Sequence, residues 1–444
     1  MKVHFISIGG AVMHNLAIAL HKGGWLVTGS DDEIYEPAKS RLEKYGLLPP
    51  QNGWFPEKLD AKLDAVILGM HARKENPELL RAQELGIKIY SFPEFMYDQS
   101  RLKKRIVIGG SHGKTSTTAM IMFVLKYHGI KFDYLVGSLI EGFETMVGID
   151  AESKLAVFEG DEYLTSPIDL RPKFHVYLAN TGIITGIAWD HINVFPTYEN
   201  YVEQFSIFIK ELPENGKLIY CASDPEVKRV CENTPCKAKL IPYATPPHQI
   251  REGVTFLQTA NGEIPLKVFG NHNLQNMMAA KKACFDAGVD ETQFYKAIQQ
   301  FKGSAKRLET LRETKDSIIY RDFAHAPSKL KATINAVKEL FPERKLIAAY
   351  ELHTFSSLDK KFLPHYLDTM KEADIATVFF SEHALEMKKL PMLTVTEVAS
   401  AFGGNVQVFT QKDELKAYLS SHYTSHDNLL LMSSGTFDGM DLNF

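Results

Sequence analysis

The stretch VIGGSHGKTSTTA at residues 107–119 constrains the fold of this chain more than any other feature. An apolar strand leads into glycines, and Gly-Lys-Thr then opens a Thr-rich helix, which is typical of a phosphate-binding loop. The common loop has a glycine where this chain has Ile108, so the loop is one residue tighter. Its backbone N–H groups and the helix N-terminus still favour bound phosphate. The alternative is a glycine-rich turn with an incidental lysine.

Within this loop, Lys114 is predicted to reach the β- and γ-phosphates of ATP, and the Thr115 hydroxyl is predicted to bind Mg²⁺. The residues of the loop that we expect around the nucleotide are Gly110, Ser111, His112, Gly113, Lys114, Thr115 and Ser116.

Strands and helices alternate along most of the chain, which predicts an α/β fold. We expect three domains: a Rossmann-like domain at 1–103, a P-loop ATPase-like central domain at 104–305 and a second Rossmann-like domain at 306–444. The Pro-rich stretch 232–265 has only a weak pattern, and its elements stay unassigned.

Composition excludes several classes of protein. The chain has 444 residues, a net charge of −4 and no block of Lys and Arg, so a nucleic-acid binder is not expected. Four cysteines in a chain of this length predict reduced thiols rather than a disulfide scaffold. Without a run of about 18 apolar residues, no membrane span is expected. A cytoplasmic enzyme, monomeric or weakly dimeric, is the prediction.

Acidic residues and a histidine follow two further apolar stretches. KLAVFEGDEY contains Glu159, Asp161 and Glu162, and GIAWDHINVF contains Asp190 and His191. Carboxylates at the C-terminal end of a strand lie where ligands bind in open α/β sheets. Beside a phosphate loop they are candidate ligands of divalent cations, because phosphate charge must be neutralised. The alternatives are a solvated acidic loop and a histidine packed under a tryptophan.

Three later motifs carry further candidates. FGNHNLQN places Asn273 and Asn276 at a helix start, where amides would bind a base edge or merely cap the helix. KRLE contains Arg307, and DFAHAP contributes Asp322 and His325 at a strand end. Cations there would meet a γ-phosphate, or they are simply surface charges.

Taken in order, HFISIGG, GGSHGKTS, EGDEY, WDH, GNHNLQN, KRLE and DFAHAP resemble the motifs of the Mur ligases, the ATP-dependent amide-forming enzymes of peptidoglycan synthesis. The resemblance covers nearly the whole chain. It implies a UDP-sugar domain, a central ATPase domain and a C-terminal domain that brings the amine. The implied cofactors are ATP and Mg²⁺, and the implied substrates are UDP-N-acetylmuramate and an amino-acid or peptide amine.

The resemblance also implies roles for single residues. Glu159 and His191 match magnesium ligands alongside Thr115, and Asn276 matches an amide that contacts adenine, with Asn273 nearby. The residues that match contacts to the nucleotide from across the domain junction are Arg307, Asp322 and His325. The residues implied to face the UDP-sugar are Gly9, Gly10, Ala11, Met13 and Asp31. The catalytic residues implied are Lys114, Glu159, His191 and Arg307.

Two branches of the family stay open. Val12 before Met13, and Arg171, Lys173 and Phe174 after DEY, resemble the branch that joins L-alanyl-γ-D-glutamyl-meso-diaminopimelate to UDP-N-acetylmuramate through an acyl phosphate. The segment LHTFSS resembles the branch that adds L-alanine instead.

A nicotinamide-dependent dehydrogenase is the alternative from another class. It rests on Gly9 and Gly10 after the first strand, although Ser7 and Val12 occupy positions where its fingerprint requires glycines.

Overall fold

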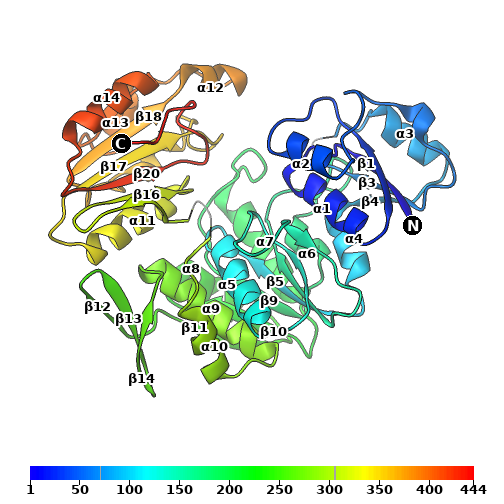
Figure 1. The fold of residues 1–444 in the computed structure, drawn as a ribbon, viewed down its shortest axis with the longest axis horizontal. Coiled ribbons are helices and arrows are strands. Elements are labelled where there is room, and N and C mark those ends of the chain that lie inside the picture. Colours follow the sequence, from blue (N-terminus) through cyan, green and yellow to red (C-terminus); the bar gives the residue numbers. More distant parts are fainter. Residues whose placement is uncertain (71, 305–306) are drawn as a thin grey trace. The chain divides into compact units, whose positions relative to one another are not determined.

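The computed structural model describes residues 1–70, 72–304 and 307–444, and it confirms the predicted α/β fold (Figure 1). The chain forms two compact units. The first comprises 1–187, 202–243 and 279–297, and the second comprises 188–201, 244–278 and 298–444. The domain boundaries predicted after residues 103 and 305 stay predictions, and Ala305 and Lys306 lie outside the described residues.

A four-stranded parallel sheet with the order β2-β1-β3-β4 begins the first unit. Its strands are β1 (Lys2–Ile6), β2 (Leu26–Ser30), β3 (Ala65–Leu68) and β4 (Ile89–Ser91). Its helices are α1 (Ala11–Lys22), α2 (Ala38–Lys44), α3 (Pro77–Glu84) and α4 (Phe92–Gln99). Since β2 and β3 flank β1 on opposite sides, the strand order reverses at β1. The loop after β1 therefore lies at a topological switch point, where such sheets bind ligands.

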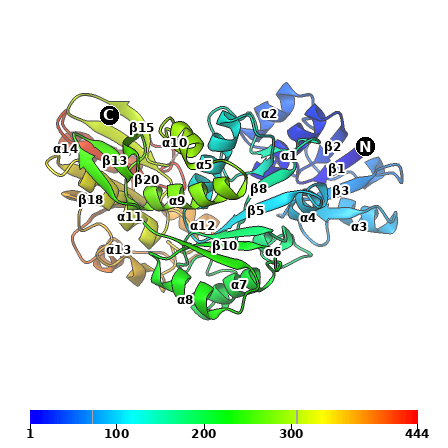
Figure 2. The same ribbon diagram turned by 90° about the horizontal axis from the view of Figure 1, so that it is seen from below.

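The seven-stranded sheet of the first unit has the order β11-β10-β9-β5-β8-β6-β7 and is parallel except for β7. Its strands β5, β8 and β10 are labelled in Figure 2. Its strands are β5 (Lys104–Gly109), β6 (Asp133–Leu135), β7 (Val147–Gly148), β8 (Leu155–Glu159), β9 (Thr181–Ile184), β10 (Lys217–Cys221) and β11 (Lys239–Tyr243). The helices of this part of the sequence are α5 (Lys114–Tyr127), α6 (Lys173–Val176), α7 (Tyr198–Lys210), α8 (Pro225–Asn233), α9 (Asn271–Asp286) and α10 (Glu291–Ile298). Because β5 lies between β8 and β9, three parallel strand ends meet beside the phosphate loop.

The unassigned stretch 232–265 contributes β11 and most of a three-stranded antiparallel sheet. This sheet consists of β12 (His248–Arg251), β13 (Val254–Thr259) and β14 (Gly262–Leu266). Gly253 and Gly262 have φ values of 73° and 109°, so both tight turns use backbone that other residues rarely adopt.

The second unit also contains a six-stranded sheet with the order β15-β16-β20-β17-β18-β19, in which only β15 is antiparallel. Its strands are β15 (Glu309–Glu313), β16 (Ile318–Asp322), β17 (Leu346–Leu352), β18 (Ile375–Phe380), β19 (Gln407–Phe409) and β20 (Asn428–Met432). The helices are α11 (Pro327–Leu340), α12 (Glu382–Met387), α13 (Val395–Ala401) and α14 (Lys412–His422).

Both faces of this six-stranded sheet are buried, which explains the nearly unbroken apolar run of β17. Tyr350 packs on one face with Leu330 and Ile334 of α11, whereas Ile347 packs on the other face with Leu415 of α14. Figure 1 shows the ribbons of α11 and α14 on either side of this sheet.

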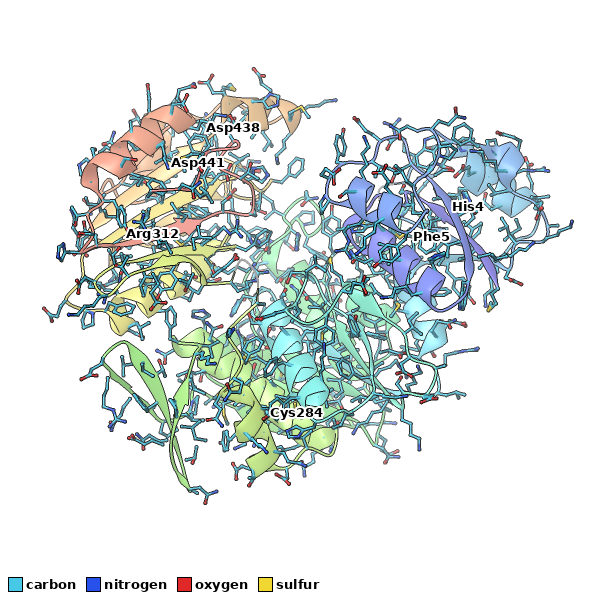
Figure 3. All side chains as sticks on the ribbon, in the orientation of Figure 1. His4, Phe5, Cys284, Arg312, Asp438 and Asp441 are labelled. Carbon is cyan, nitrogen blue, oxygen red and sulfur yellow. The ribbon has the colours of Figure 1, made fainter. Side chains whose placement is uncertain are left out.

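The four cysteines are free thiols, and Cys284 on α9 is buried (Figure 3). This confirms the expectation that the chain has no disulfide scaffold. Among the described residues, no helix combines the length and the apolar character needed to cross a membrane.

Candidate active site

The phosphate loop connects the central strand β5 to α5, as the sequence predicts. Gly110 has a φ of 135° and Gly113, which precedes the first turn of α5, has a φ of 79°. Such values favour glycine, and they let successive N–H groups point to one side. The N–H of Ser111 donates to Gly186 O at 2.9 Å, and the Thr185 hydroxyl donates to Gly109 O at 3.1 Å. The end of β9 therefore fixes the shape of the loop.

Lys114 is held inside this loop by two acceptors. Its Nζ donates to Gly110 O at 2.5 Å and to Glu162 Oε2 at 2.6 Å. Burial disfavours the ammonium, but the Glu162 and Asp161 carboxylates more than offset this effect, so the pKa of Lys114 is raised. The lysine thus stays charged at the N-terminus of α5. Glu162 was predicted only as an acid after a strand, and its pairing with Lys114 was not predicted.

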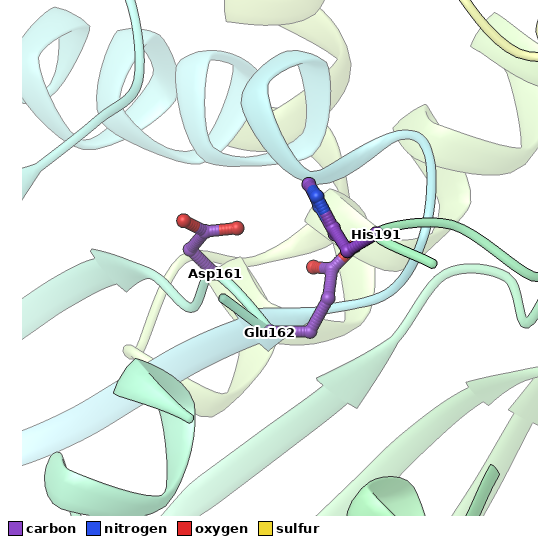
Figure 4. Close-up of side chains that lie close together, drawn as sticks. All are labelled: Asp161, Glu162 and His191. Carbon is purple, nitrogen blue, oxygen red and sulfur yellow. The ribbon is translucent and has the colours of Figure 1, made fainter. Parts of the chain in front are cut away.

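Glu159 and Thr115, two of the predicted magnesium ligands, are brought together. Thr115 Oγ1 donates to Glu159 Oε1 at 2.8 Å, and the N–H of Gly137 donates to Glu159 Oε2 at 2.6 Å. Asp161 and Glu162 follow directly after β8 (Figure 4), and Asp161 accepts a hydrogen bond from Lys173 at 2.6 Å. A hydroxyl and several carboxylates beside a phosphate loop form an all-oxygen donor set, which fits Mg²⁺.

His191, the remaining predicted ligand, belongs to the second unit. It has a φ of 55°, and its N–H donates to Asp190 Oδ1 at 2.8 Å. The Asp190 carboxylate lies 3.7 Å from both His325 Nε2 and Lys329 Nζ. Burial opposes the charge of Asp190, but the nearby His325 ring and the Lys329 ammonium outweigh this effect and lower the pKa of Asp190. The pairing of His191 with Glu159 on one ion stays a prediction.

Burial lowers the pKa of His325, the charge of Lys329 lowers it further, and the Asp190 carboxylate acts against both effects. His325 Nδ1 is 2.9 Å from Phe323 O, so this nitrogen carries the hydrogen and donates. The predicted contact of His325 with nucleotide stays a prediction. Its contact with Asp190 brings the motif DFAHAP next to the motif WDH.

Asp322 is buried, and backbone N–H groups donate hydrogen bonds to its carboxylate. It accepts from the N–H of Leu308 at 2.7 Å and from the N–H of Ala324 at 2.8 Å. Burial raises its pKa, although the charge of Arg307 acts in the opposite direction. The Arg307 guanidinium lies 4.8 Å from the centre of the Phe323 ring. Asp322 therefore shapes the loop that carries Arg307.

Asn273 and Asn276 are both buried on the first turns of α9. The Asn273 amide donates to Phe269 O at 3.0 Å and so holds the chain that enters the helix. Within the described ranges, the Asn276 side chain makes no hydrogen bond to the protein, which leaves it the better candidate for binding a base edge.

The glycine loop after β1 is tied to the end of β2 by Asp31. The N–H of Gly9 donates to Asp31 Oδ2 at 2.7 Å, and the N–H of Asp32 donates to Asp31 Oδ1 at 3.0 Å. Met13 is buried, whereas Ala11 is exposed. Oδ2 of Asp31 thus holds the glycine loop, and Oδ1 holds the backbone just after β2. Burial raises the pKa of Asp31 to about 6.

The Asp31 carboxyl gives a prediction about pH and stability. Its pKa in the folded chain is about 6, above the ordinary value of 3.8. The folded state therefore binds the extra proton, and the stability that this proton contributes is present below the ordinary pKa and lost as the pH rises through about 6. Relative to Asp31→Asn, the wild type should gain on the order of 1 kcal/mol between about pH 7.5 and about pH 5. Urea denaturation at both pH values measures this difference.

Glu43→Gln, which removes an exposed carboxylate from α2, is the matched control for this experiment. A difference between wild type and Asp31→Asn that does not change with pH would contradict the raised pKa of Asp31.

Comparison with known proteins places three family models along the chain in succession. The description "Mur ligase family, catalytic domain" matches residues 2–104, "Mur ligase middle domain" matches 108–284, and "Mur ligase, glutamate ligase domain" matches 306–435.

Full-length relatives carry two kinds of name. A UDP-N-acetylmuramate–L-alanine ligase of Desulfitobacterium hafniense is 29% identical, with 98% of this chain and 97% of the relative covered. A UDP-N-acetylmuramate–L-alanyl-γ-D-glutamyl-meso-2,6-diaminoheptandioate ligase of Haemophilus influenzae is 28% identical, covering 99% and 97%.

Solved structures show the same fold. A murein peptide ligase from Psychrobacter arcticus matches with a TM-score of 0.68 and 22% identity. A UDP-N-acetylmuramate-alanine ligase from Thermotoga maritima matches with a TM-score of 0.72 and 20% identity. Each match covers 99% of this chain and 97% of the other.

Proposed function

The chain belongs to the Mur ligase family, the ATP-dependent amide ligases of peptidoglycan synthesis, and on this premise we propose that it joins L-alanyl-γ-D-glutamyl-meso-diaminopimelate to UDP-N-acetylmuramate. The phosphate loop is the main observation that supports a ligase reaction. In it, Lys114 is held as a cation by Glu162, and the Thr115 hydroxyl donates a hydrogen bond to Glu159. A relative at 28% identity bears the name of this tripeptide activity.

In the proposed reaction, the muramoyl carboxylate attacks the γ-phosphorus of ATP, and the bond from that phosphorus to the bridging oxygen of ADP breaks. The amine then attacks the acyl carbon, phosphate leaves, and the nitrogen loses a proton. Lys114 would neutralise charge on the transferred phosphoryl group, and Arg307 would assist. Thr115, Glu159 and His191 would hold magnesium, which supplies positive charge for the phosphate oxygens when it is bound.

L-alanine is the second candidate amine. The relative with 29% identity is named for L-alanine ligation, and relatives from Clostridium kluyveri, Aquifex aeolicus and Carboxydothermus hydrogenoformans carry the same name. Two of the residues that favour the tripeptide branch have local structural roles, because Lys173 pairs with Asp161 and Phe174 is buried against Gly160. The family assignment does not support the alternative of a nicotinamide-dependent dehydrogenase.

One assay separates the candidates. The protein is mixed with Mg²⁺, ATP and UDP-N-acetylmuramate, and either the tripeptide or L-alanine is added. Mass spectrometry then weighs the products, with ATP omitted as the control. A new amide with the tripeptide supports the proposal, and a product with L-alanine alone selects the second candidate. No product and no ATP consumption with either amine would overturn ligation.

His191→Ala is expected to raise the magnesium concentration needed for half-maximal ATP consumption about tenfold or more, because an imidazole ligand would be lost. Titration of Mg²⁺ at saturating ATP measures this shift. His383→Ala, at an exposed position on α12, is the matched control. An unchanged magnesium requirement would count against His191 as a ligand.

A further inference from the structure

A series of hydrogen bonds, joined by the peptide between Val136 and Gly137, runs from the glycine loop after β1 to Glu159 at the end of β8. It begins at the carbonyl of Gly10, which lies 2.8 Å from His14 Nδ1, so this nitrogen carries the hydrogen and donates. Burial lowers the pKa of His14 and favours the neutral ring, and Arg41 lowers this pKa as well. The other nitrogen, Nε2, is therefore an acceptor, and it lies 2.9 Å from Asn15 Nδ2.

Asn15 is buried, and all of its side-chain hydrogen-bonding groups are used. Its Nδ2 donates to Ala11 O at 2.7 Å as well as to His14. Its Oδ1 accepts from Arg41 Nη2 at 2.9 Å and from the N–H of Met146 at 3.0 Å. The last bond joins positions 131 residues apart, between α1 and the residue just before β7. This pattern fixes the orientation of the amide.

Met146 links Asn15 to the Glu159 carboxylate, which is a predicted ligand of magnesium. Its carbonyl accepts from the N–H of Val136 at 3.0 Å, and the N–H of the next residue, Gly137, donates to Glu159 Oε2 at 2.6 Å. A Cβ on Gly137 would lie 2.8 Å from Glu159 Oε1, so the backbone approaches the carboxylate as closely as glycine allows. The other oxygen of Glu159 accepts from Thr115 of the phosphate loop.

We propose that Asn15 is a positioning residue that sets the glycine loop and the Glu159 carboxylate in one fixed geometry. The inference rests on the proposed function, in which the loop faces UDP-N-acetylmuramate and Glu159 faces magnesium. Through Asn15, the sugar-linked acid would be presented at a constant distance from the phosphoryl group, and positioning of this kind contributes strongly to catalysis.

Several charged groups surround this series of bonds. Arg41 on α2 also donates to the carbonyl of Glu144, whose carboxylate accepts hydrogen bonds from Lys22 and Tyr45. Asp31 lies on the other side of the glycine loop, at Gly9.

Asn15→Asp tests the proposal with almost no change in volume. At about pH 8 the new carboxylate faces Ala11 O and the lone pair of His14 Nε2, where the amide donated. We expect the Kd for UDP-N-acetylmuramate, measured by calorimetry without metal, to rise about three- to tenfold. The magnesium concentration for half-maximal ATP consumption should rise by a similar factor. At about pH 6 a protonated His14 donates to the carboxylate, so both ratios to wild type should fall.

Lys22→Gln is the matched control, because it removes an exposed ion pair with Glu144 at the same contact and leaves Asn15 intact. Both constants should stay at their wild-type values in this variant. Measuring wild type at each pH separates the effect from the titration of Asp31.

The results for Asn15→Asp decide whether Asn15 positions the two sites or only stabilises the fold. A lower melting temperature with both constants unchanged would make Asn15 merely structural and would overturn the proposal. A changed Kd with an unchanged magnesium requirement would overturn the link to Glu159. A wild type that does not bind UDP-N-acetylmuramate would overturn the proposed function as well. If Asn15→Asp does not fold, Gly137→Ala replaces it, because Gly137 contacts Glu159 at the opposite end of the series. If the two sites are linked, this variant should raise the Kd for UDP-N-acetylmuramate measured without metal.

Discussion

Lys114→Ala is expected to abolish amide formation and ATP consumption while the affinity for UDP-N-acetylmuramate stays near the wild-type value. The Lys114 ammonium lies at the N-terminus of α5, between Gly110 O and Glu162. Removing one preorganised charge of this kind costs about a hundredfold to a thousandfold in kcat. Product mass and ATP turnover measure the loss, and calorimetry measures the affinity. If sugar-nucleotide binding collapsed too, the predicted division at residues 103 and 104 would be wrong.

The same substitution also affects stability, and a second variant separates the two effects. The Glu162 side chain is 1% exposed, so loss of the lysine removes the cation beside a buried carboxylate, at a cost of about 3–5 kcal/mol. Lys114→Met combined with Glu162→Gln should recover most of this stability without recovering ATP turnover. Recovery of both would show that Lys114 acts only through folding.

Gly110→Ala is expected to eliminate nucleotide binding and to destabilise the first unit by about 2–4 kcal/mol. The φ of 135° at Gly110 is one that other residues rarely adopt. A Cβ there would overlap Thr185 Oγ1 and lie 3.0 Å from the N–H nitrogen of Thr185, which is backbone and cannot yield. The end of β9 and the phosphate loop would have to separate. Thermal unfolding and binding of a fluorescent ATP analogue check both effects.

Gly129→Ala is the matched control for this substitution. Gly129 follows α5 with a φ of 68°, but a Cβ there would meet nothing within 4 Å. It should cost about 1 kcal/mol and leave nucleotide binding intact. Equal losses in both variants would show that backbone strain alone matters, and that the contact with Thr185 does not.

The grouping of Thr115 with Glu159 was predictable because local rules act there. A strand, a glycine turn and a helix fix Lys114 and Thr115, and acids after a neighbouring parallel strand must come to the same edge. Asp31 illustrates the limit of such rules. The resemblance implied that it faces the UDP-sugar, but only the structure shows that both of its oxygens bind backbone N–H groups.

Asn15 and Gly137 could not be found from the sequence, because their partners come from distant segments. The contact of Asn15 with Met146 spans 131 residues, and nothing in the local pattern marks either residue. The small sheet β12-β13-β14 was missed for a related reason. Its strands are short and partly exposed, so no clear alternation marks them.

Strand β20, the last strand in chain order, lies between β16 and β17, and it pairs with both. While the ribosome is still extending the chain, these two strands are finished yet lack the neighbour that they share. Until β20 is synthesised, the backbone N–H and C=O groups of β16 and β17 that face it stay unpaired. An unpaired strand edge can form hydrogen bonds with another chain. Slow translation or premature termination ahead of residue 428 should therefore turn this part of the nascent protein into an aggregation-prone intermediate and a client of chaperones.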